Sequence, residues 1–339
     1  MAPTASPSKR THDVIAVGAG TIDHYVSCSA FEKRKDALAP EGIDTCFPVG
    51  AKLKAERIEM QTGGGATNAA VTFARQKLKT AVICRVGKDL YAPILKDILA
   101  KEKIETDLIQ TDPESATAQS IILLSDIGHR TILIHRGASA KINKREIPWQ
   151  KLRPRWFYVT SLGGDLSLFS MILDRAEACG ASVCWNPGNA ELAKGMHVLA
   201  PLIRRTDIFD VNREEAAMLT NQPPRHLKRI MHALEALPKL GLLITDGPKG
   251  AYLHTKCCSW YAPPLPGKRV NTTGAGDALG SGFLAGFIRT CDLSIALKVG
   301  MLNALGVIMH MGAKTGILKE WPKETALKHV RIQPAKLHD

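Results

Sequence analysis

The stretch Asn271–Gly282 reads NTTGAGDALGSG, a glycine-rich turn that runs into an apolar helical segment. Small residues let a ligand approach the backbone closely. A helix that begins here directs unpaired N–H groups and the positive end of its dipole at that ligand. We therefore expect an anion hole at Gly274, Ala275 and Gly276, suited to the charge on a transferring phosphoryl group. Asp277 is then placed to accept a proton from an attacking hydroxyl, although a plain helix cap explains the same residues.

A second glycine-rich segment, GGGATN at Gly63–Asn68, also precedes a predicted helix. Gly64 and Gly65 expose backbone amides, and Asn68 offers both a donor and an acceptor to a hydroxyl-rich ligand. The segment is not a P-loop, because no Gly-Lys-Ser/Thr follows it. A flexible loop followed by a helix cap is the alternative interpretation.

A third motif, GAGTID at Gly18–Asp23, follows the predicted strand Val14–Val17. It begins like a dinucleotide-binding fingerprint, but Asp23 stands in place of the third glycine and prolines interrupt the stretch where a helix should follow. A dinucleotide-dependent oxidoreductase is therefore disfavoured. A carboxylate at the end of a strand can accept hydrogen bonds from two sugar hydroxyls, and a turn residue is the alternative.

Two weaker motifs follow later strands. Asn212 and Glu215 lie three residues apart at the start of a predicted helix, so they can share one face. An amide and a carboxylate there could position hydrated Mg²⁺, although an ordinary helix N-terminus has the same composition. TDGPKG at residues 245–250 is either a strand–turn–strand connection or a backbone site for a nucleotide.

Short apolar runs alternate with helical stretches along most of the chain. The predicted strands cover residues 14–17, 80–84, 156–160, 182–185, 208–211 and 242–245. The predicted helices cover residues 66–78, 90–102, 166–179, 213–220, 275–289 and 295–311. This alternation is typical of a mainly parallel sheet that helices cover on both faces.

Two segments break the alternation. Residues 26–61 contain prolines and glycines without a helical period, and residues 119–136 read as a hairpin with its turn at 126–130. We expect these segments to form a small β-sheet that stands off the main sheet. Because the chain shows no internal repeat and no clean linker, one domain with a lid is favoured over two domains in tandem.

The composition limits the partners. The formal net charge of +13, from 45 basic and 32 acidic residues, favours anionic ligands. The basic residues are scattered and aromatic residues make up only 5%, which argues against nucleic acid. The eight cysteines form no C-x-x-C pair, which predicts reduced thiols in the cytoplasm. No apolar run predicts a membrane span, and residues 1–12 resemble a loose tail rather than a secretory signal.

Together and in this order, the five motifs resemble those of the ribokinase-like (PfkB) carbohydrate kinase family, from about Val14 to about Gly316. The resemblance implies an α/β fold: a three-layer α/β/α sandwich with a mainly parallel central sheet and a small β-sheet lid. It implies a kinase domain over residues 13–330, with the lid at about 24–62 and 117–137. The segments 1–12 and 331–339 would be a disordered N-terminal tail and a C-terminal tail.

The resemblance also implies transfer of the γ-phosphoryl group of ATP to a primary hydroxyl of a small ribose-like, fructose-like or ketodeoxygluconate-like sugar. Asp277 would be the general base, and residues 274–276 would form the anion hole. The residues expected at the substrate hydroxyls are Asp23, Gly64, Gly65 and Asn68. The residues expected at the nucleotide are Asn212, Thr245, Gly247, Gly250 and Asn303. Glu215 is expected at Mg²⁺.

The chain departs from the family pattern in three places. Asn271, two residues before Thr273, stands where the family signature has an aspartate that helps to bind a monovalent cation. The resemblance implies potassium as a further cofactor, whereas Asn271 argues against it. The segment Ser161–Gly164, with Asp165 just beyond it, stands where many ribokinases have a sugar-contacting glutamate. Gly65 stands where ribokinases often have lysine. The sugar is therefore not fixed by the resemblance.

Other functions stay open at this point. A nucleoside kinase needs an apolar slot for a base, and Tyr25, Phe31 and Phe47 are the candidates in the lid segments. A non-catalytic sugar- or nucleotide-binding protein is a third hypothesis, but the three carboxylates expected at the site are all present. A homodimer could form through the lid, because pairing two lids would cover their exposed strand edges.

Overall fold

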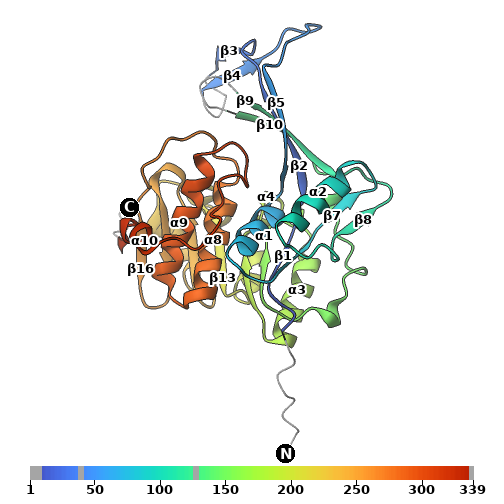
Figure 1. Cartoon of the computed structure of the whole chain (residues 1–339). Helices are drawn as coiled ribbons and strands as arrows, with labels where there is room; N and C mark the ends of the chain where they lie inside the picture. Colours follow the sequence, from blue (N-terminus) through green and yellow to red (C-terminus); the bar gives the residue numbers. More distant parts are fainter. Residues whose placement is uncertain (1–9, 37–41, 125–129, 336–339) are drawn as a thin grey trace, which may run out of the picture.

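The computed structural model describes residues 10–36, 42–124 and 130–335 (Figure 1). Residues 1–9 of the predicted N-terminal tail, residues 126–129 of the predicted hairpin turn and residues 336–339 lie outside the described residues. Within the described residues, no helix is long and apolar enough to cross a membrane.

A nine-stranded sheet forms the centre of the protein. Six neighbouring strands run parallel, and three antiparallel strands extend one edge. In spatial order they are β6 (Thr80–Ile83), β1 (His12–Val17), β11 (Pro154–Val159), β12 (Ser182–Trp185), β13 (Ile208–Asn212), β14 (Gly241–Thr245), β15 (Ala251–His254), β16 (Ser259–Ala262) and β17 (Gln333–Pro334). The parallel strands read as continuous apolar runs because helices bury both of their faces. Both predicted tails contribute strand residues, His12 to β1 and 333–334 to β17.

Helices cover the two faces of this sheet. One face carries α3 (Leu166–Cys179), α4 (Asn189–Leu192), α5 (Met196–Ile203), α6 (Arg213–Thr220) and α7 (Leu227–Leu234). The other carries α1 (Gly65–Arg75), α2 (Tyr91–Lys101), α8 (Ala275–Thr290) and α9 (Leu293–Ile308), with α10 (Glu324–His329) against α9. Short 3₁₀ turns cover Gly137–Ala140, Trp149–Lys151 and Gly247–Lys249.

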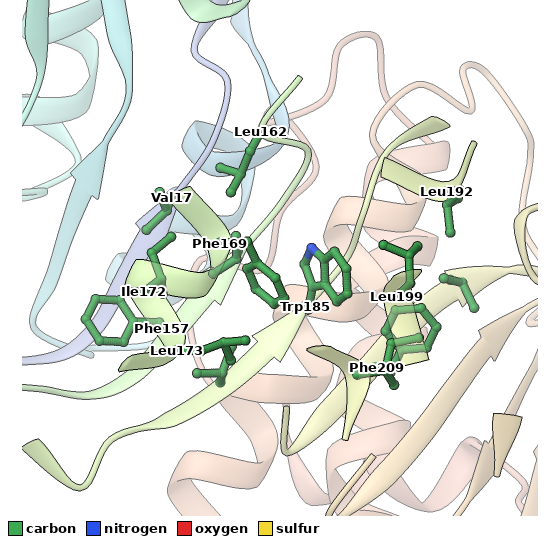
Figure 2. Packing of buried hydrophobic residues seen from close by; sticks show 14 of the residues in the cluster. Val17, Phe157, Leu162, Phe169, Ile172, Leu173, Trp185, Leu192, Leu199 and Phe209 are labelled. Atoms are coloured by element: carbon green, nitrogen blue, oxygen red, sulfur yellow. The ribbon is translucent and has the colours of Figure 1, made fainter. Parts of the chain in front are cut away.

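The alternation of side chains along each strand builds both layers. Phe157 of β11 packs with α3, whereas its neighbours Trp156 and Tyr158 pack with α8. In the first layer, Phe169 of α3 stacks on Trp185 of β12 with 3.9 Å between ring centroids (Figure 2). The layers hold the carboxyl ends of the parallel strands in place, and the motifs at 18–23, 212–215 and 245–250 lie at the ends of β1, β13 and β14.

A second sheet stands away from the sandwich as a lid (Figure 1). Its strands, in spatial order, are β10 (Arg130–His135), β9 (Ala118–Leu124), β2 (Thr21–Ser27) and β5 (Arg57–Gly63). The hairpin of β3 (Glu32–Lys35) and β4 (Ile43–Cys46) lies at its outer end, and β7 (Arg85–Gly87) pairs with β8 (Gln110–Asp112) below it. The predicted three-layer sandwich with a small β-sheet lid is confirmed.

Candidate active site

The two glycine-rich motifs meet at the N-termini of two helices. Asn68, in the first turn of α1, donates a hydrogen bond from Nδ2 to Oδ2 of Asp277 in the first turn of α8, at 2.8 Å. Gly64 and Gly274 precede these helices with φ of 93° and 79°, a backbone conformation that favours glycine. Segments 209 residues apart in the sequence are thereby joined through one carboxylate.

The environment of Asp277 suits a group that exchanges a proton. Burial raises the pKa of Asp277, while the hydrogen bond from Asn68 and the positive charge of Lys314 lower it. Asp23 contributes a further small rise. A general base works best when its pKa approaches the working pH, so these opposing effects favour the predicted role of Asp277.

Asp23 lies on the face of the lid that looks toward the sandwich. It is buried, and its Oδ1 accepts a hydrogen bond from the Thr21 hydroxyl at 2.9 Å. Gly63 lies directly beside it, since a Cβ there would come within 1.9 Å of Asp23 Oδ2. In the register of the lid, Ser120 and Gln61 lie opposite Asp23 on its two neighbouring strands. Opposite residues share a face of the sheet, so a hydroxyl and an amide flank this carboxylate.

A cavity of about 440 Å³ opens on the other side of the α8 N-terminus. Its polar lining includes Asn212, Thr245, Gly247, Gly250, Ala275 and Gly276. At Gly276 a Cβ would meet nothing within 4 Å, so the backbone there faces open space. At Gly250 a Cβ would lie 2.1 Å from the Ala262 carbonyl oxygen. Two of the three residues predicted for the anion hole, Ala275 and Gly276, therefore line one cavity with four residues predicted for the nucleotide site.

The apolar wall of this cavity was not predicted. Met301, Ala304, Leu305 and Ile308 of α9 line it together with Leu265. Their spacing of three, four and seven residues places them on one face of a helix, and this spacing was the signal available in the sequence. An apolar wall of this kind suits the flat face of a nucleotide base.

Asn303 is the predicted residue that the structure keeps away from the cavity. Its side chain is fully buried. Nδ2 donates to the Ala278 carbonyl oxygen at 2.7 Å and to the Thr72 hydroxyl at 3.1 Å, while Oδ1 accepts from the Leu318 amide at 2.9 Å. Asn303 therefore ties α9 to α8 and α1, and has no free group for a nucleotide.

Asn212 and Glu215 form a reciprocal cap at the start of α6. Asn212 Oδ1 accepts a hydrogen bond from the backbone N–H of Glu215, and Glu215 Oε2 accepts one from the backbone N–H of Asn212, both at 2.8 Å. Burial raises the pKa of Glu215, and Asp277 adds to this rise. The described residues contain no group of three or more His, Cys, Asp or Glu side chains that could hold a metal. The donor set fits a Mg²⁺ ion that is bound mainly by phosphate oxygens and water, as Mg²⁺ prefers.

The lid reaches the glycine-rich turn at 271–274 through Arg130, another residue that was not predicted. The Arg130 guanidinium donates to the Thr272 hydroxyl, and Arg130 lines the cavity together with Gly276. Tyr25 is buried beside Asn271 and Thr273. Tyr25 Oη, Asn271 Nδ2 and Thr273 Oγ1 have no hydrogen-bond partner among the described residues. Polar groups therefore gather where the lid meets the turn at 271–274.

The three aromatic residues considered for a base slot do not form one. Phe31 and Phe47 pack edge to face, with 5.3 Å between centroids, next to the outer hairpin of the lid, and Phe47 is about half exposed. Tyr25 lies instead among Asp23, Arg130 and Asn271.

Known proteins share this sequence pattern. The pfkB family carbohydrate kinase model matches residues 38–320. An uncharacterized sugar kinase of Archaeoglobus fulgidus is 29% identical over 255 residues, which cover 72% of this chain and 97% of that protein. A ribokinase of Haemophilus influenzae is 23% identical over 306 residues, 89% of this chain and 94% of that protein.

Solved structures share the fold. A nucleoside kinase of Methanocaldococcus jannaschii has a TM-score of 0.73 at 19% identity, over 95% of this chain and 98% of that one. A ribokinase of Arabidopsis thaliana, complexed with ribose and ATP, has a TM-score of 0.74 at 19% identity, over 94% of this chain and 97% of that one. The family resemblance and the ribokinase-like fold are thus both confirmed. Because the family match spans most of the sequence and the fold agrees with it, this chain belongs to the pfkB family of carbohydrate kinases, which phosphorylate hydroxyl groups.

Proposed function

We propose that this protein transfers the γ-phosphoryl group of ATP to a primary hydroxyl of a small sugar, with Asp277 as the general base. The observation that carries the proposal is the Asn68–Asp277 hydrogen bond. It joins the two glycine-rich motifs at one carboxylate, which feels the charge of Asp23 in the lid and is the neighbour in sequence of Gly276, a residue of the cavity lining. A sugar on one side and a nucleotide on the other would then meet at Asp277.

The chain supplies three parts of the reaction. Asp23, Asn68 and the backbone of Gly64 and Gly65 would bind and orient the sugar hydroxyls. The reacting hydroxyl would lose its proton to a carboxylate oxygen of Asp277 as its oxygen attacks phosphorus. Catalysis of phosphoryl transfer is mostly positioning and charge stabilisation.

The N-terminus of α8 would stabilise the charge that develops during transfer. The N–H groups at residues 274–276 lie at the positive end of the helix dipole, and Ala275 and Gly276 line the cavity. Closure of the lid would exclude water, which otherwise competes for the phosphoryl group. Arg130 would bring a positive charge to the cavity from the lid.

The nucleotide would lie along Asn212, Thr245, Gly247 and Gly250, with its base against the apolar wall from α9. Glu215 and Asn212 would position Mg²⁺, which neutralises charge on phosphate oxygens when bound. At Asn271, Oδ1 accepts from the Thr273 amide at 3.0 Å and Nδ2 is a donor. A donor at this position opposes a cation, so we expect turnover without potassium.

A small sugar is favoured over a nucleoside because the groups around Tyr25 are polar and Tyr25 lies apart from the Phe31–Phe47 pair. The fold is nevertheless shared with a solved nucleoside kinase. The acceptor panel therefore includes both classes.

We further propose that a second copy of the chain covers the outer face of the lid. Val26, Ile58, Met60, Ile121 and Leu133 share the lid face opposite to Asp23 in the strand register. Four of them are large apolar side chains at least two-fifths exposed.

The eight cysteines are free thiols, which supports action in a reducing compartment, the cytoplasm.

The test is an assay of ADP release with MgATP. The acceptors are ribose, fructose, ketodeoxygluconate, fructose phosphate, adenosine, inosine and cytidine, each with sodium or potassium. We expect one sugar to give clear turnover, equal in both salts. Turnover with a nucleoside alone would replace the sugar proposal, and nucleotide binding without any turnover would favour a binding protein.

Asp277→Asn tests the base. We expect it to lose most turnover, at least about 10²-fold, while ATP binding and the unfolding temperature stay near those of the parent protein. Asp97→Asn, at an exposed position of α2, is the matched control. Parent-like turnover in Asp277→Asn would remove Asp277 from the mechanism.

A further inference from the structure

Lys314 is a buried lysine that none of the sequence motifs contains. It lies in the loop after α9 and is 8% exposed. Its Nζ donates to the Thr62 carbonyl oxygen at 2.7 Å and to the Thr67 hydroxyl at 3.0 Å. Burying an ammonium group is costly unless it is paired and hydrogen-bonded, so this position calls for an explanation.

The contacts of Lys314 converge on the Gly63–Asn68 loop. Thr67 in turn donates its hydroxyl proton toward the Gly63 carbonyl oxygen at 2.5 Å, with the Gly64 carbonyl oxygen at 3.1 Å. Three consecutive carbonyl groups, those of residues 62–64, are thus held from one side, the first directly by Lys314 and the other two through Thr67. These residues are the end of the lid strand β5 and the cap of α1.

The charges around Lys314 belong to the proposed site. The titratable and charged groups that face it are Asp23 of β2, Asp277 of α8, Cys84 after β6, Glu102 after α2 and Arg75 of α1. Arg75 pairs with Glu102 and donates to the Lys314 and Ile317 carbonyl oxygens, which fixes the loop. Asp23 and Asp277 are therefore left as the carboxylates whose charges the ammonium group offsets.

We propose that Lys314 is a positioning residue for phosphoryl transfer: it fixes the substrate loop through Thr62 and Thr67 and offsets the charges of Asp23 and Asp277. This inference rests on the proposed function. Two separate consequences follow. Loss of the hydrogen bonds loosens the loop, and loss of the positive charge makes Asp277 harder to deprotonate.

Two substitutions separate these consequences. Lys314→Met removes both the donors and the charge, whereas Lys314→Gln removes the charge and keeps N–H donors on a side chain one bond shorter. Lys319→Met, at an exposed position of the same segment, is the matched control. The nucleotide cavity does not include Lys314, so ATP affinity serves as a check that each variant is folded.

The first readout is backbone hydrogen exchange over residues 57–75, measured by mass spectrometry without substrate. We expect faster exchange in Lys314→Met, and exchange close to that of the parent in Lys314→Gln and Lys319→Met. Parent-like exchange in Lys314→Met would overturn the role in fixing the loop. This readout needs no turnover, so it stands even if the acceptor panel defeats the proposed function.

The second readout is the pH dependence of kcat/KM with the accepted sugar. We expect the acidic limb to move to higher pH in both Lys314→Met and Lys314→Gln, because a nearby cation stabilises the carboxylate of Asp277. We expect kcat/KM at neutral pH to fall about 10²-fold in Lys314→Met, as for other losses of alignment, and less in Lys314→Gln. An acidic limb that stays in place in both variants would overturn the charge role.

Discussion

Burial of Lys314 makes stability depend on pH. Burial lowers its pKa to about 7 in the folded protein, whereas an unfolded lysine has a pKa of about 10.4. Between these values the unfolded chain binds one more proton at this residue, so the free energy of unfolding rises with pH. Burial of Lys314 therefore lowers the free energy of unfolding most below pH 7, and this penalty becomes smaller as the pH rises above 7.

The corresponding prediction compares urea denaturation at pH 7 and pH 8.5. The parent protein should gain up to about 1.4 kcal/mol of unfolding free energy per pH unit from this residue, and Lys314→Met should lose that gain. Burial raises the pKa of Cys84 to about 12. Above the ordinary cysteine pKa of about 8.5 this makes the free energy of unfolding fall with pH, so the comparison ends at pH 8.5. Equal slopes in the two proteins would contradict the lowered pKa.

Single residues of the site were predictable where the chemistry was local. Asp277 and Asn68 belong to glycine-rich turns before helices, and the structure joins them. Lys314 and Gln61 belong to no glycine-rich turn or other motif that neighbouring residues would reveal. Their positions depend on a loop after α9 and on the strand register of the lid, neither of which neighbouring residues in the sequence define.

At the scale of elements, the N-terminus of α8 contains two glycines with different reasons to be glycine. Gly274 has φ of 79°, and a Cβ there would lie 2.5 Å from Cβ of Ala313. Gly276 has open space in front of it. The first glycine is required by the fold, and the second by the ligand that we propose to approach it.

Gly276→Val should therefore fold and unfold like the parent protein but lose turnover. We expect a loss of about 10²–10³-fold, because the valine side chain would fill the space in front of the backbone donors, and losing one donor to a developing charge has an effect of this size. Gly274→Val should instead lower the unfolding temperature, since both its backbone conformation and its packing oppose a side chain. Circular dichroism melts together with the ADP-release assay check both results. A Gly276→Val enzyme with full turnover would remove the anion hole from this position.

Helices and strands were predicted well where one period dominated. Leu166–Cys179 and Arg213–Thr220 are helices over the predicted ranges. The lid was less defined, because β2 and β5 lie within or beside a segment without a clear period. The position of Asn303 shows the same limit, since only packing decides which face of α9 meets the cavity.

At the scale of the whole molecule, the outer face of the lid leads to a prediction about assembly. Light scattering should give a particle of twice the chain mass of 36.8 kDa. Leu133→Lys together with Met60→Lys should convert it to a monomer, because two charges would have to be buried. Val198→Lys on α5 is the control, at an exposed apolar position of the sandwich. A parent protein that is already monomeric would refute the proposed dimer.

The row of residues that spans the inner face of the lid has a consequence for how this enzyme could diverge. Ile134, Ser120, Asp23 and Gln61 come from four different strands and lie side by side in register. None of them belongs to the helix that carries Asp277. Under the proposed function, substitutions in this row could change acceptor choice one strand at a time without altering the half of the site that carries Asp277, so a new specificity need not begin with a loss of rate.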